Sequence, residues 1–288
     1  MSQYKMVALD MDGTLLNNKH EISERSAQTL KKLSEKGVMI VIATGRSSGS
    51  VTKYVTTALA QLQQQKVPMI VFNGSVCIIR DQQTGEFEKV FSNTLTLEAV
   101  RDLIRMTSEE NLVLQFYNGE TGEVFVNPRP GNEEHLALVK RYGDLVGKPQ
   151  TVVEDYEDLL AAGILPVKIL ALTPESKVDE VFAKPLSVNL HRIRGSPHPF
   201  FVEYLMPGNT KGTAIASLCQ RLGVGLGEVV AFGDGENDAE MLEAVGLGVA
   251  MKNARPKAKE YANEVTSHIN DDDGVARHLE ALFGLLAA

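Results

Sequence analysis

The stretch Met6-Val-Ala-Leu-Asp10-Met-Asp12-Gly-Thr-Leu-Leu16 decides how the rest of this chain is interpreted. Its first four residues are apolar, which is typical of a buried strand in a parallel sheet, and its two aspartates begin where that strand ends. Side chains two positions apart in an extended chain point to the same side. The stretch therefore predicts that Asp10 and Asp12 face one ligand at the carboxyl edge of an open α/β sheet, where such sheets bind their ligands.

Other apolar strands in the chain also end in polar groups. The run 38–43 leads into Thr44-Gly45-Arg46, the run 69–72 leads into Asn73-Gly74, and the run 229–232 leads into Gly233-Asp234-Gly-Glu-Asn237-Asp238. Any one of these aspartates alone is more often a helix cap or a turn former. The combination of motifs in one chain instead favours a functional site at one edge of the sheet.

The four aspartates of these motifs are predicted to meet at that edge, where their charges repel one another. At an effective dielectric constant near 20, two unit charges about 4 Å apart interact by roughly 4 kcal/mol. A divalent cation removes this conflict, and carboxylate oxygens without a neighbouring His or Cys ligand favour Mg²⁺. We therefore predict a Mg²⁺ site that involves Asp10, Asp12, Asp234 and Asp238.

Several residues at the same edge suit a phosphate group. Thr44 and Gly45 offer a hydroxyl and backbone N–H groups near the start of a helix, which attracts anions. Lys211 opens a helix, where a positive charge is unfavourable unless an anion lies near it; the alternative is a solvated lysine on the helix surface. Asn237 has an amide that either donates to phosphate or forms a turn, and Arg46, Asn73 and Gly74 border the same edge and are further candidates for substrate contact.

The composition restricts the class of protein. The chain has 288 residues, 43% of them hydrophobic and 23% charged, which is enough for one or two globular domains with a real core. A formal net charge of −8 argues against nucleic acid or an anionic membrane as the main partner. Cys77 and Cys219 lack the spacing of a zinc or disulfide motif. No apolar run has the length of a membrane span and the start does not resemble a signal peptide, so we expect a cytoplasmic protein.

The order of expected elements divides the chain into two domains. Strands 6–9, 38–43 and 69–72 alternate with helices, one capped by Ser23 and one at about 50–65. Hairpins and helices then mix up to a strand at 186–193, after which the strand–helix alternation returns. We predict an α/β protein with a Rossmann-like parallel sheet as its core, formed by residues 1–84 and 191–288, and an inserted α+β domain at 85–190.

Together these motifs resemble those of the haloacid dehalogenase (HAD) superfamily of phosphohydrolases, specifically its Cof-like subgroup with a type IIB cap. The segment from Asp10 to Leu16 resembles the first motif of the family, Thr44-Gly45-Arg46 the second, Lys211-Gly212 the third and 233–238 the fourth. Residues 249–254 and 273–275 resemble the end of the subgroup's chains. Ser75 departs from the pattern, since relatives often have Ala at this position.

The resemblance implies a mechanism and a role for each motif. Asp10 would attack phosphorus and form an aspartyl-phosphate, while Asp12 would protonate the leaving alcohol and then activate water. The Asp10 carboxylate, the Asp12 backbone carbonyl and the Asp234 carboxylate would hold Mg²⁺, with Asp238 supporting directly or through water. The phosphoryl group would be held by Thr44, Lys211 and Asn237, and the inserted domain would act as a cap that selects the substrate.

We therefore expect a Mg²⁺-dependent phosphatase that acts on a small-molecule phosphate ester, such as a sugar phosphate or a nucleotide-like cofactor. A sugar phosphomutase on the same scaffold is one alternative, although the basic residues of 85–190 are scattered among many acids, which favours hydrolysis. A regulator that binds metal and phosphate without turnover is the other, and the presence of both Asp10 and Asp12 disfavours it. The sequence leaves the oligomeric state open.

Overall fold

The computed structural model describes residues 3–119, 121–147, 149–195 and 198–285. The chain forms two compact units. The core unit comprises the chain up to Phe91 and from Thr210 onward, and the inserted unit is Ser92–Asn209. The two ends of the inserted unit meet, because Asn93 Nδ2 donates a hydrogen bond to Asn209 Oδ1 at 3.0 Å.

The core unit is built on an eight-stranded sheet with the order β14-β13-β12-β1-β2-β3-β4-β5. The parallel strands are β1 (Met6–Leu9), β2 (Met39–Ala43), β3 (Lys66–Val71), β12 (Val229–Gly233), β13 (Leu247–Ala250) and β14 (Glu264–Val265). β4 (Val76–Asp81) is antiparallel to β3, and β5 (Phe87–Ser92) forms the edge. All four residues of β1 are fully buried, which is why this strand is a continuous apolar run.

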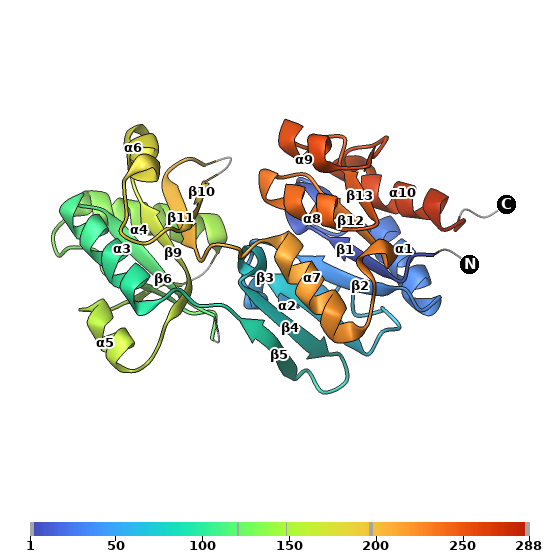
Figure 1. Ribbon diagram of the computed structural model, residues 1–288, viewed down its shortest axis with the longest axis horizontal. Helices are drawn as coiled ribbons and strands as arrows, with labels where there is room; N and C mark the ends of the chain where they lie inside the picture. The colour runs from blue at the N-terminus through green and yellow to red at the C-terminus, as the bar shows by residue number, and fades with distance from the viewer. Residues whose placement is uncertain (1–2, 120, 148, 196–197, 286–288) are drawn as a thin grey trace. The chain divides into compact units, whose positions relative to one another are not determined.

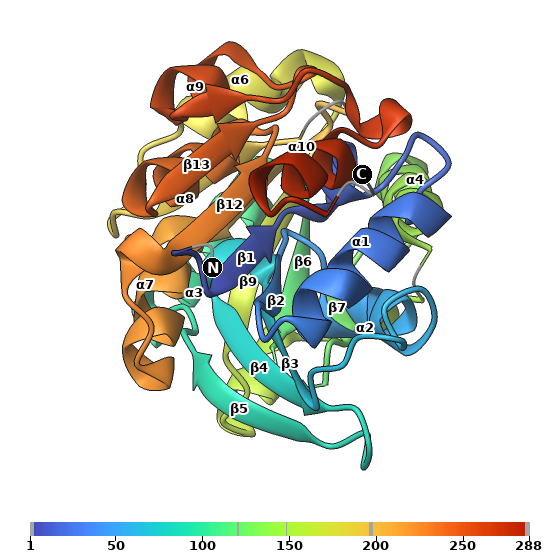
Figure 2. The ribbon, with the colours of Figure 1, turned by 90° about the vertical axis from the view of Figure 1, so that its right-hand side faces the viewer.

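Helices cover both faces of this sheet (Figure 2). On one face lie α1 (Glu24–Glu35), α2 (Ser48–Thr56) and α10 (Gly274–Leu282), and on the other lie α7 (Lys211–Leu222) and α8 (Ala239–Ala244), with α9 (Pro256–Tyr261) against α8. Single tight turns follow or precede several strands: η1 (Met11–Leu15), η2 (Phe72–Gly74), η4 (Leu226–Glu228), η5 (Glu236–Asp238) and η6 (Asn270–Asp272). This is the doubly wound, largely parallel α/β architecture that the sequence predicts.

The inserted unit has a six-stranded sheet of its own, with the order β10-β11-β9-β6-β7-β8. Its strands are β6 (Val113–Asn118), β7 (Val124–Val126), β8 (Thr151–Val152), β9 (Pro166–Leu172), β10 (His191–Arg194) and β11 (Phe201–Leu205). Its helices are α3 (Leu97–Glu109), α4 (Glu133–Val146), α5 (Tyr156–Ala161) and α6 (Val178–Ala183), with the turn η3 (Glu175–Lys177). Neighbouring strands of this sheet are antiparallel, except β7 and β8, which are parallel.

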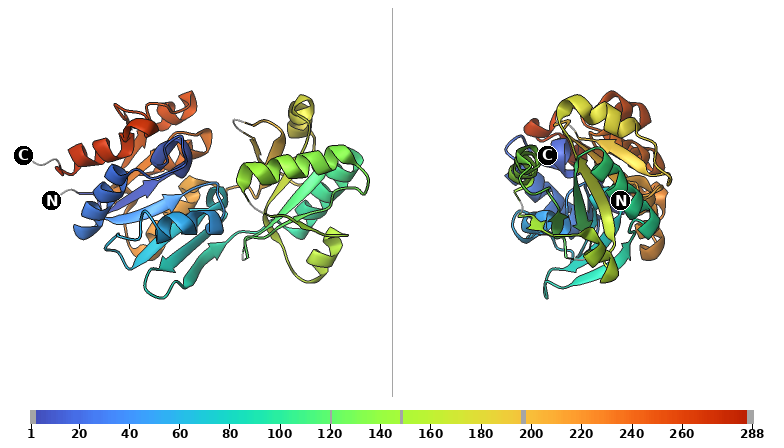
Figure 3. Two further views of the ribbon diagram at one scale, coloured as in Figure 1. Left: turned by 180° about the vertical axis from the view of Figure 1, so that it is seen from behind. Right: turned by 90° about the vertical axis from the view of Figure 1, so that its left-hand side faces the viewer.

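The sheet of the inserted unit is covered on both faces. α3 lies on one face (Figure 1), where its Val100 and Leu103 join Phe116 and Ile169 in an apolar core. α4 crosses the opposite face, as the view from behind shows (Figure 3). In the sheet itself, Lys168 Nζ of β9 lies 2.9 Å from Glu203 Oε2 of β11, and both side chains are buried.

The division of the chain differs from the predicted boundaries at 84/85 and 190/191. The hairpin β4–β5 extends the core sheet, because β4 pairs with β3 along its whole length. Residues 191–205 belong to the inserted unit, because β11 pairs antiparallel with both β9 and β10. The strand β11 was not among the expected elements.

Two expected elements are also shorter than predicted. The helix expected at about 50–65 ends at Thr56, where the hydroxyls of Thr56 and Thr57 hydrogen-bond back to the Lys53 carbonyl and compete with further helical turns. The strand expected at 186–193 covers only His191–Arg194. The Ser187 N–H donates to the Asp102 carboxylate at 2.6 Å instead of to a neighbouring strand.

Candidate active site

The register of the parallel strands brings the predicted motifs to one edge of the core sheet. Leu9 at the end of β1 lies opposite Phe232 of β12 and Ile42 of β2. The residues that follow these three positions therefore leave the sheet at the same level. Asp10, Thr44 and Asp234 all come from these strand ends, as the sequence predicts.

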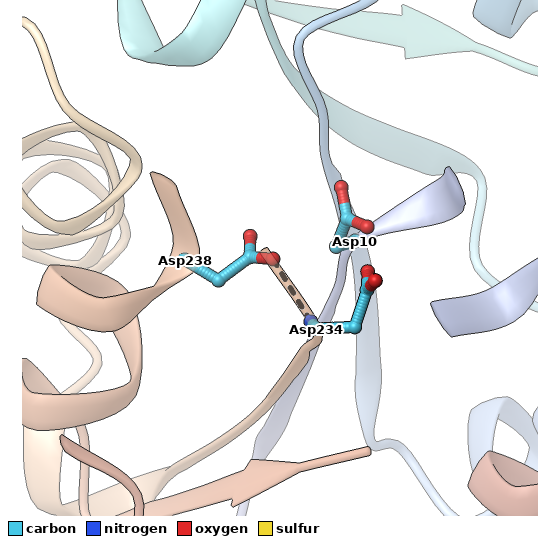
Figure 4. A group of neighbouring side chains, drawn as sticks. All are labelled: Asp10, Asp234 and Asp238. Atoms are coloured by element: carbon cyan, nitrogen blue, oxygen red, sulfur yellow. Dashed lines mark hydrogen bonds between the residues drawn. The ribbon is translucent and has the colours of Figure 1, made fainter. Parts of the chain in front are cut away.

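Three carboxylates gather at this edge (Figure 4). Asp10 follows β1, Asp234 follows β12 and Asp238 lies in η5. Each offers a carboxylate oxygen, and these oxygens lie within 4.8 Å of one another. Asp10 and Asp238 are buried, with 5% and 1% of their surface exposed, and Asp234 is half-buried.

Lys211 is the counter-charge of this cluster. It is the first residue of α7, whose start is capped by the Thr210 side chain. Its Nζ lies 2.6 Å from Asp10 Oδ1 and 2.6 Å from Asp238 Oδ1, and the side chain is fully buried. The alternative of a solvated surface lysine is therefore wrong.

The electrostatics of the cluster favour a divalent cation. Burial raises the pKa of Asp10 well above its usual range; Lys211 opposes this shift, and the charges of Asp238 and Asp234 add to it. Burial, followed by the charge of Asp238, raises the pKa of Asp234 to about 6. One lysine among three buried or half-buried carboxylates leaves an excess of negative charge. This set of oxygen donors fits a hard divalent cation.

Asp238 also organises the turn that carries Asp234. Its Oδ2 accepts hydrogen bonds from the N–H groups of Asp234 at 3.0 Å and Gly235 at 2.8 Å, while its Oδ1 accepts from Lys211. Both oxygens of Asp238 are thus engaged by protein donors, which suits a supporting role rather than a direct ligand. Asp234 Oδ1 accepts from the Thr14 hydroxyl at 3.1 Å, which ties this carboxylate to the first motif.

The carboxylate of Asp12 lies outside this cluster and is paired with Arg46. Arg46 Nε donates to Asp12 Oδ2 at 2.7 Å, and Nη2 donates to Oδ1. Burial opposes the shift, but the hydrogen bonds and charge of Arg46 hold the pKa of Asp12 below its usual value. The predicted contribution of the Asp12 backbone carbonyl to a metal site stays a prediction.

The remaining predicted residues come from the ends of β2, β3 and β12. Thr44 is buried, and its carbonyl accepts from the Asn73 N–H at 3.1 Å. Asn237 Nδ2 donates to Asn73 Oδ1 at 2.9 Å. The same Asn73 Oδ1 would lie 2.8 Å from a Cβ added at Gly45, so a side chain at that position would crowd Asn73.

Gly74 allows the close approach of the helix that carries Lys211. Its φ is +100°, and an added Cβ would lie 2.3 Å from the Thr210 carbonyl oxygen. Only glycine fits this position without displacement.

The structure thus brings all the predicted site residues into one region of the core unit. Ser75, which departs from the family pattern, is buried.

Sequence reasoning missed four residues around this site. Thr14 contacts Asp234, and its signal was the Gly-Thr turn after Asp12. Asn253 Nδ2 donates to the Gly13 carbonyl at 2.8 Å. His20 Nδ1 lies 3.5 Å from Asp12 Oδ1, and the hydroxyl of Tyr54 contacts Arg46. His20 and Tyr54 belong to no motif that the sequence displays.

Among the residues that the structure describes, no helix is both long and apolar enough to cross a bilayer.

Comparison with known proteins gives one consistent family. The model of the family described as haloacid dehalogenase-like hydrolase matches residues 7–279. The chain is similar to the putative phosphatase YxeH of Bacillus subtilis, with 30% identity over 97% of this chain and 98% of the relative. It is also similar to the 5-amino-6-(5-phospho-D-ribitylamino)uracil phosphatase YitU of the same organism, with 29% identity over 97% and 98%.

Among solved structures, a HAD subclass IIB sugar phosphatase superposes with a TM-score of 0.77 at 25% identity, covering 98% of this chain and 100% of that one. These likenesses confirm the predicted fold class and the predicted resemblance. The strand-end motifs, the parallel sheet and this match over nearly the full length show that the chain belongs to the haloacid dehalogenase-like hydrolase family.

Proposed function

We propose that this hydrolase is a Mg²⁺-dependent phosphatase that cleaves small phosphomonoesters through a phosphorylated Asp10. The observation that carries the proposal is the arrangement around Asp10. Its buried carboxylate lies among Asp234, Asp238 and Lys211, while Asp12, two residues on, holds a separate carboxylate paired with Arg46. This arrangement supports a role for Asp10 in attack on phosphorus and a role for Asp12 in proton transfer.

The first half of the proposed reaction transfers the phosphoryl group to the protein. The Asp10 carboxylate attacks phosphorus, and the bond between phosphorus and the leaving oxygen breaks. Asp12, protonated at this stage, gives its proton to that oxygen, so that a neutral alcohol departs. Lys211 fixes the orientation of the Asp10 carboxylate through the contact at Oδ1.

The second half releases phosphate. The Asp12 carboxylate takes a proton from a water molecule, whose oxygen attacks phosphorus, and the bond between phosphorus and Asp10 breaks. Arg46 outweighs the opposing effect of burial and lowers the pKa of Asp12, which favours this role as a base and makes the protonated form required in the first half the less populated one. Inorganic phosphate and the free Asp10 carboxylate result, which balances the hydrolysis of one ester by one water.

The residues suited to hold Mg²⁺ are Asp10 and Asp234, with Asp238 in support. When bound, the ion would supply positive charge that keeps these carboxylates ionised and offsets the charge of the phosphate. We propose that Thr44, which follows β2, and Asn237, in the turn η5, donate hydrogen bonds to phosphate oxygens. In phosphoryl transfer, such positioning and charge neutralisation supply most of the catalysis.

For the substrate we propose a sugar phosphate or a nucleotide-like cofactor phosphate, selected by the inserted unit. Two relatives support this range by name, one as a sugar phosphatase and one as a phosphatase of a phosphoribitylamino-uracil. The predicted cap, 85–190, begins in the turn before β5, and most of it lies in the inserted unit, which has a sheet and an apolar core of its own.

The decisive experiment measures hydrolysis of p-nitrophenyl phosphate with Mg²⁺, with a chelator, and by the Asp10→Asn variant. We expect activity that needs Mg²⁺ and falls by at least about 10³-fold in Asp10→Asn, because an amide does not attack phosphorus. Asp81→Asn is the matched control, since Asp81 lies opposite Lys66 at the start of β3, the other end of that strand from Asn73. It should retain full activity.

Three outcomes would contradict the proposal. Activity that survives Asp10→Asn would exclude this nucleophile. Tight phosphate binding without turnover of any ester in a broad panel would favour a regulator. Interconversion of sugar 1- and 6-phosphates with a bisphosphate activator would favour a mutase.

A further inference from the structure

Tyr54 joins two parts of the site through one hydroxyl group. It lies on α2 with its side chain buried. The hydroxyl donates a hydrogen bond to the His20 carbonyl at 3.0 Å and accepts one from Arg46 Nη1 at 3.3 Å. A phenol has one proton to donate, so these two contacts are compatible.

Through its contact with Arg46, Tyr54 helps to hold the guanidinium group that engages Asp12. Nε and Nη2 of Arg46 already engage the two carboxylate oxygens of Asp12, and such a fork requires the guanidinium plane to be fixed. The Tyr54 hydroxyl engages the remaining nitrogen, Nη1. The Tyr54 ring centroid also lies 5.7 Å from the guanidinium carbon. Rotation of the guanidinium away from Asp12 therefore breaks the contact with Tyr54 as well.

The contact with His20 holds a tight loop beside the same carboxylate. The loop closes through hydrogen bonds from Asn17 N to the Glu21 carbonyl at 2.9 Å and from His20 N to the Asn17 carbonyl at 2.8 Å. His20 has a φ of +57°, which is uncommon for a residue with a side chain. Its Nδ1 lies 3.3 Å from Arg46 Nη2 and accepts from it, because a guanidinium only donates.

We propose that Tyr54 is a positioning residue for the leaving-group half of the reaction. By holding Arg46 and the His20 loop together, its hydroxyl aims the Asp12 carboxyl at the leaving oxygen. The inference rests on the proposed phosphatase function and extends it to a residue outside the phosphate-binding motifs. The hydroxyl acts on the Asp12 side of the site, whereas Asp10 is oriented by Lys211.

This division of labour makes the effect of Tyr54 depend on the leaving group. A phenol that leaves readily as its anion needs little help from a general acid, whereas a more basic phenol needs the proton that Asp12 supplies. Loss of the Tyr54 hydroxyl should therefore slow esters of basic phenols more than esters of acidic ones. A general loosening of the fold would slow all of them alike.

The test compares three phenyl esters of similar shape: p-nitrophenyl, phenyl and p-methoxyphenyl phosphate. The kcat/KM of each, which reports the steps up to departure of the leaving alcohol, is measured with Mg²⁺ for the wild type, Tyr54→Phe and the control Tyr261→Phe, whose ring is partly exposed on α9. For Tyr54→Phe we expect kcat/KM to fall about tenfold on the p-methoxyphenyl ester and less than about twofold on the p-nitrophenyl ester. The control should match the wild type on all three esters.

Equal losses on all three esters, or no loss on any, would overturn the inference. Circular dichroism and the thermal midpoint establish that each variant is folded. Should Tyr54→Phe not fold, Arg46→Lys replaces it: lysine keeps the charge but lacks the fork, so the same dependence on the leaving group is expected, and its absence counts against the inference.

A double variant gives an independent check. Because Tyr54 acts through Arg46, Tyr54→Phe in the Arg46→Lys background should lower kcat/KM on the p-methoxyphenyl ester by less than about twofold further. Fully additive losses would show that the two residues act separately. Failure of the proposed function is distinguishable from these results, since the wild type would then hydrolyse none of the esters or Asp10→Asn would remain active.

Discussion

Asp234 connects the protonation of the site with the stability of the core unit. Burial and the charge of Asp238 raise its pKa from the usual 3.8 to about 6. Between these two values the folded protein keeps a proton that the unfolded chain has lost, so the free energy of unfolding decreases as pH rises through this window. Above the folded pKa the full cost of the buried negative charge is present. Mg²⁺ bound in place of the proton would remove that cost.

We therefore expect Mg²⁺ to stabilise the protein above about pH 6 and to lose this effect as pH falls towards about 4. The measurement is the thermal midpoint with Mg²⁺ and with a chelator, at about pH 5 and about pH 8. In the control Asp234→Asn the Mg²⁺-induced shift should be small at both values. A larger Mg²⁺ effect at the lower pH would contradict this prediction.

The sequence predicted the carboxylates of the site because their position at strand ends is a local property. Asp10 and Asp234 each follow an apolar run, and the parallel register aligns those runs. Tyr54 and His20 carry no such signal. Their contacts depend on where α2 and the loop at 17–21 lie in three dimensions, and no pattern within either segment specifies that placement.

At the scale of elements, Gly74 controls how closely α7 approaches the end of β3. An added Cβ would lie 2.3 Å from the Thr210 carbonyl oxygen. Gly74→Ala should therefore push the start of α7 away and draw Lys211 from Asp10. We expect a loss of about 1–3 kcal/mol in the free energy of unfolding and a fall of about tenfold or more in kcat.

Gly37→Ala is the matched control for this prediction. Gly37 also has a positive φ, +80°, but an added Cβ there would meet nothing within 4 Å. The Gly37→Ala variant should lose about 1–2 kcal/mol in the free energy of unfolding, because alanine is strained in the left-handed backbone conformation, and its kcat should be unchanged. Urea unfolding and ester hydrolysis measure both effects. A similar loss of kcat in the two variants would exclude a specific role for the approach of α7.

In the inserted unit, a buried ion pair connects β9 and β11. Lys168 and Glu203 are both buried, so Lys168→Met leaves a buried carboxylate without this partner. We expect a loss of about 3–5 kcal/mol in the free energy of unfolding. Lys140→Met is the control, because the pair of Lys140 with Asp144 is exposed and such pairs contribute about 0–1 kcal/mol.

Urea unfolding measures both variants, and the double change Lys168→Met with Glu203→Leu completes the design. Replacing both partners removes the unpaired charge, so stability should recover relative to the single variant. A single variant as stable as the Lys140→Met control would show that the buried pair does not hold these strands together.

The elements that the sequence misplaced share a physical cause. β11 was not expected because its assignment depends on pairing with β9 and β10. β9 is distant in sequence, and β10 follows an irregular segment. The helix at 50–65 was predicted too long because the backbone contacts of the Thr56 and Thr57 hydroxyls do not change the apolar periodicity. Strands within the parallel sheet were easier to predict, since their burial on both faces gives continuous apolar runs.

At the scale of the whole molecule, the inserted unit has what an independent domain needs. Its apolar core is drawn entirely from residues between Ser92 and Asn209. We expect the excised segment 92–209 to fold by itself with a single cooperative urea transition. Circular dichroism and amide exchange measure this. A gradual, non-cooperative transition would mean that the unit depends on the core unit for its structure.

The sequence predicted that an insertion divides the core, but it did not locate the ends of the insertion. One predicted boundary falls in the turn of the hairpin β4–β5, within the core unit, and the other lies directly before β10, within the inserted unit. Antiparallel hairpins occur in both units, so a change from alternating strands and helices to hairpins does not mark the boundary. Strand pairing marks it, and pairing is a property of the folded chain.

The hydrogen bond between Asn93 and Asn209 has a consequence for how this architecture tolerates change. Because its two ends are joined, the insertion connects β5 to α7 over a short distance, whatever its length in residues. The entropy of closing such a loop rises by only about 0.6 kcal/mol for each doubling of its length. Exchange of the entire module can therefore leave Asp10, Lys211 and the sheet that aligns them unaltered.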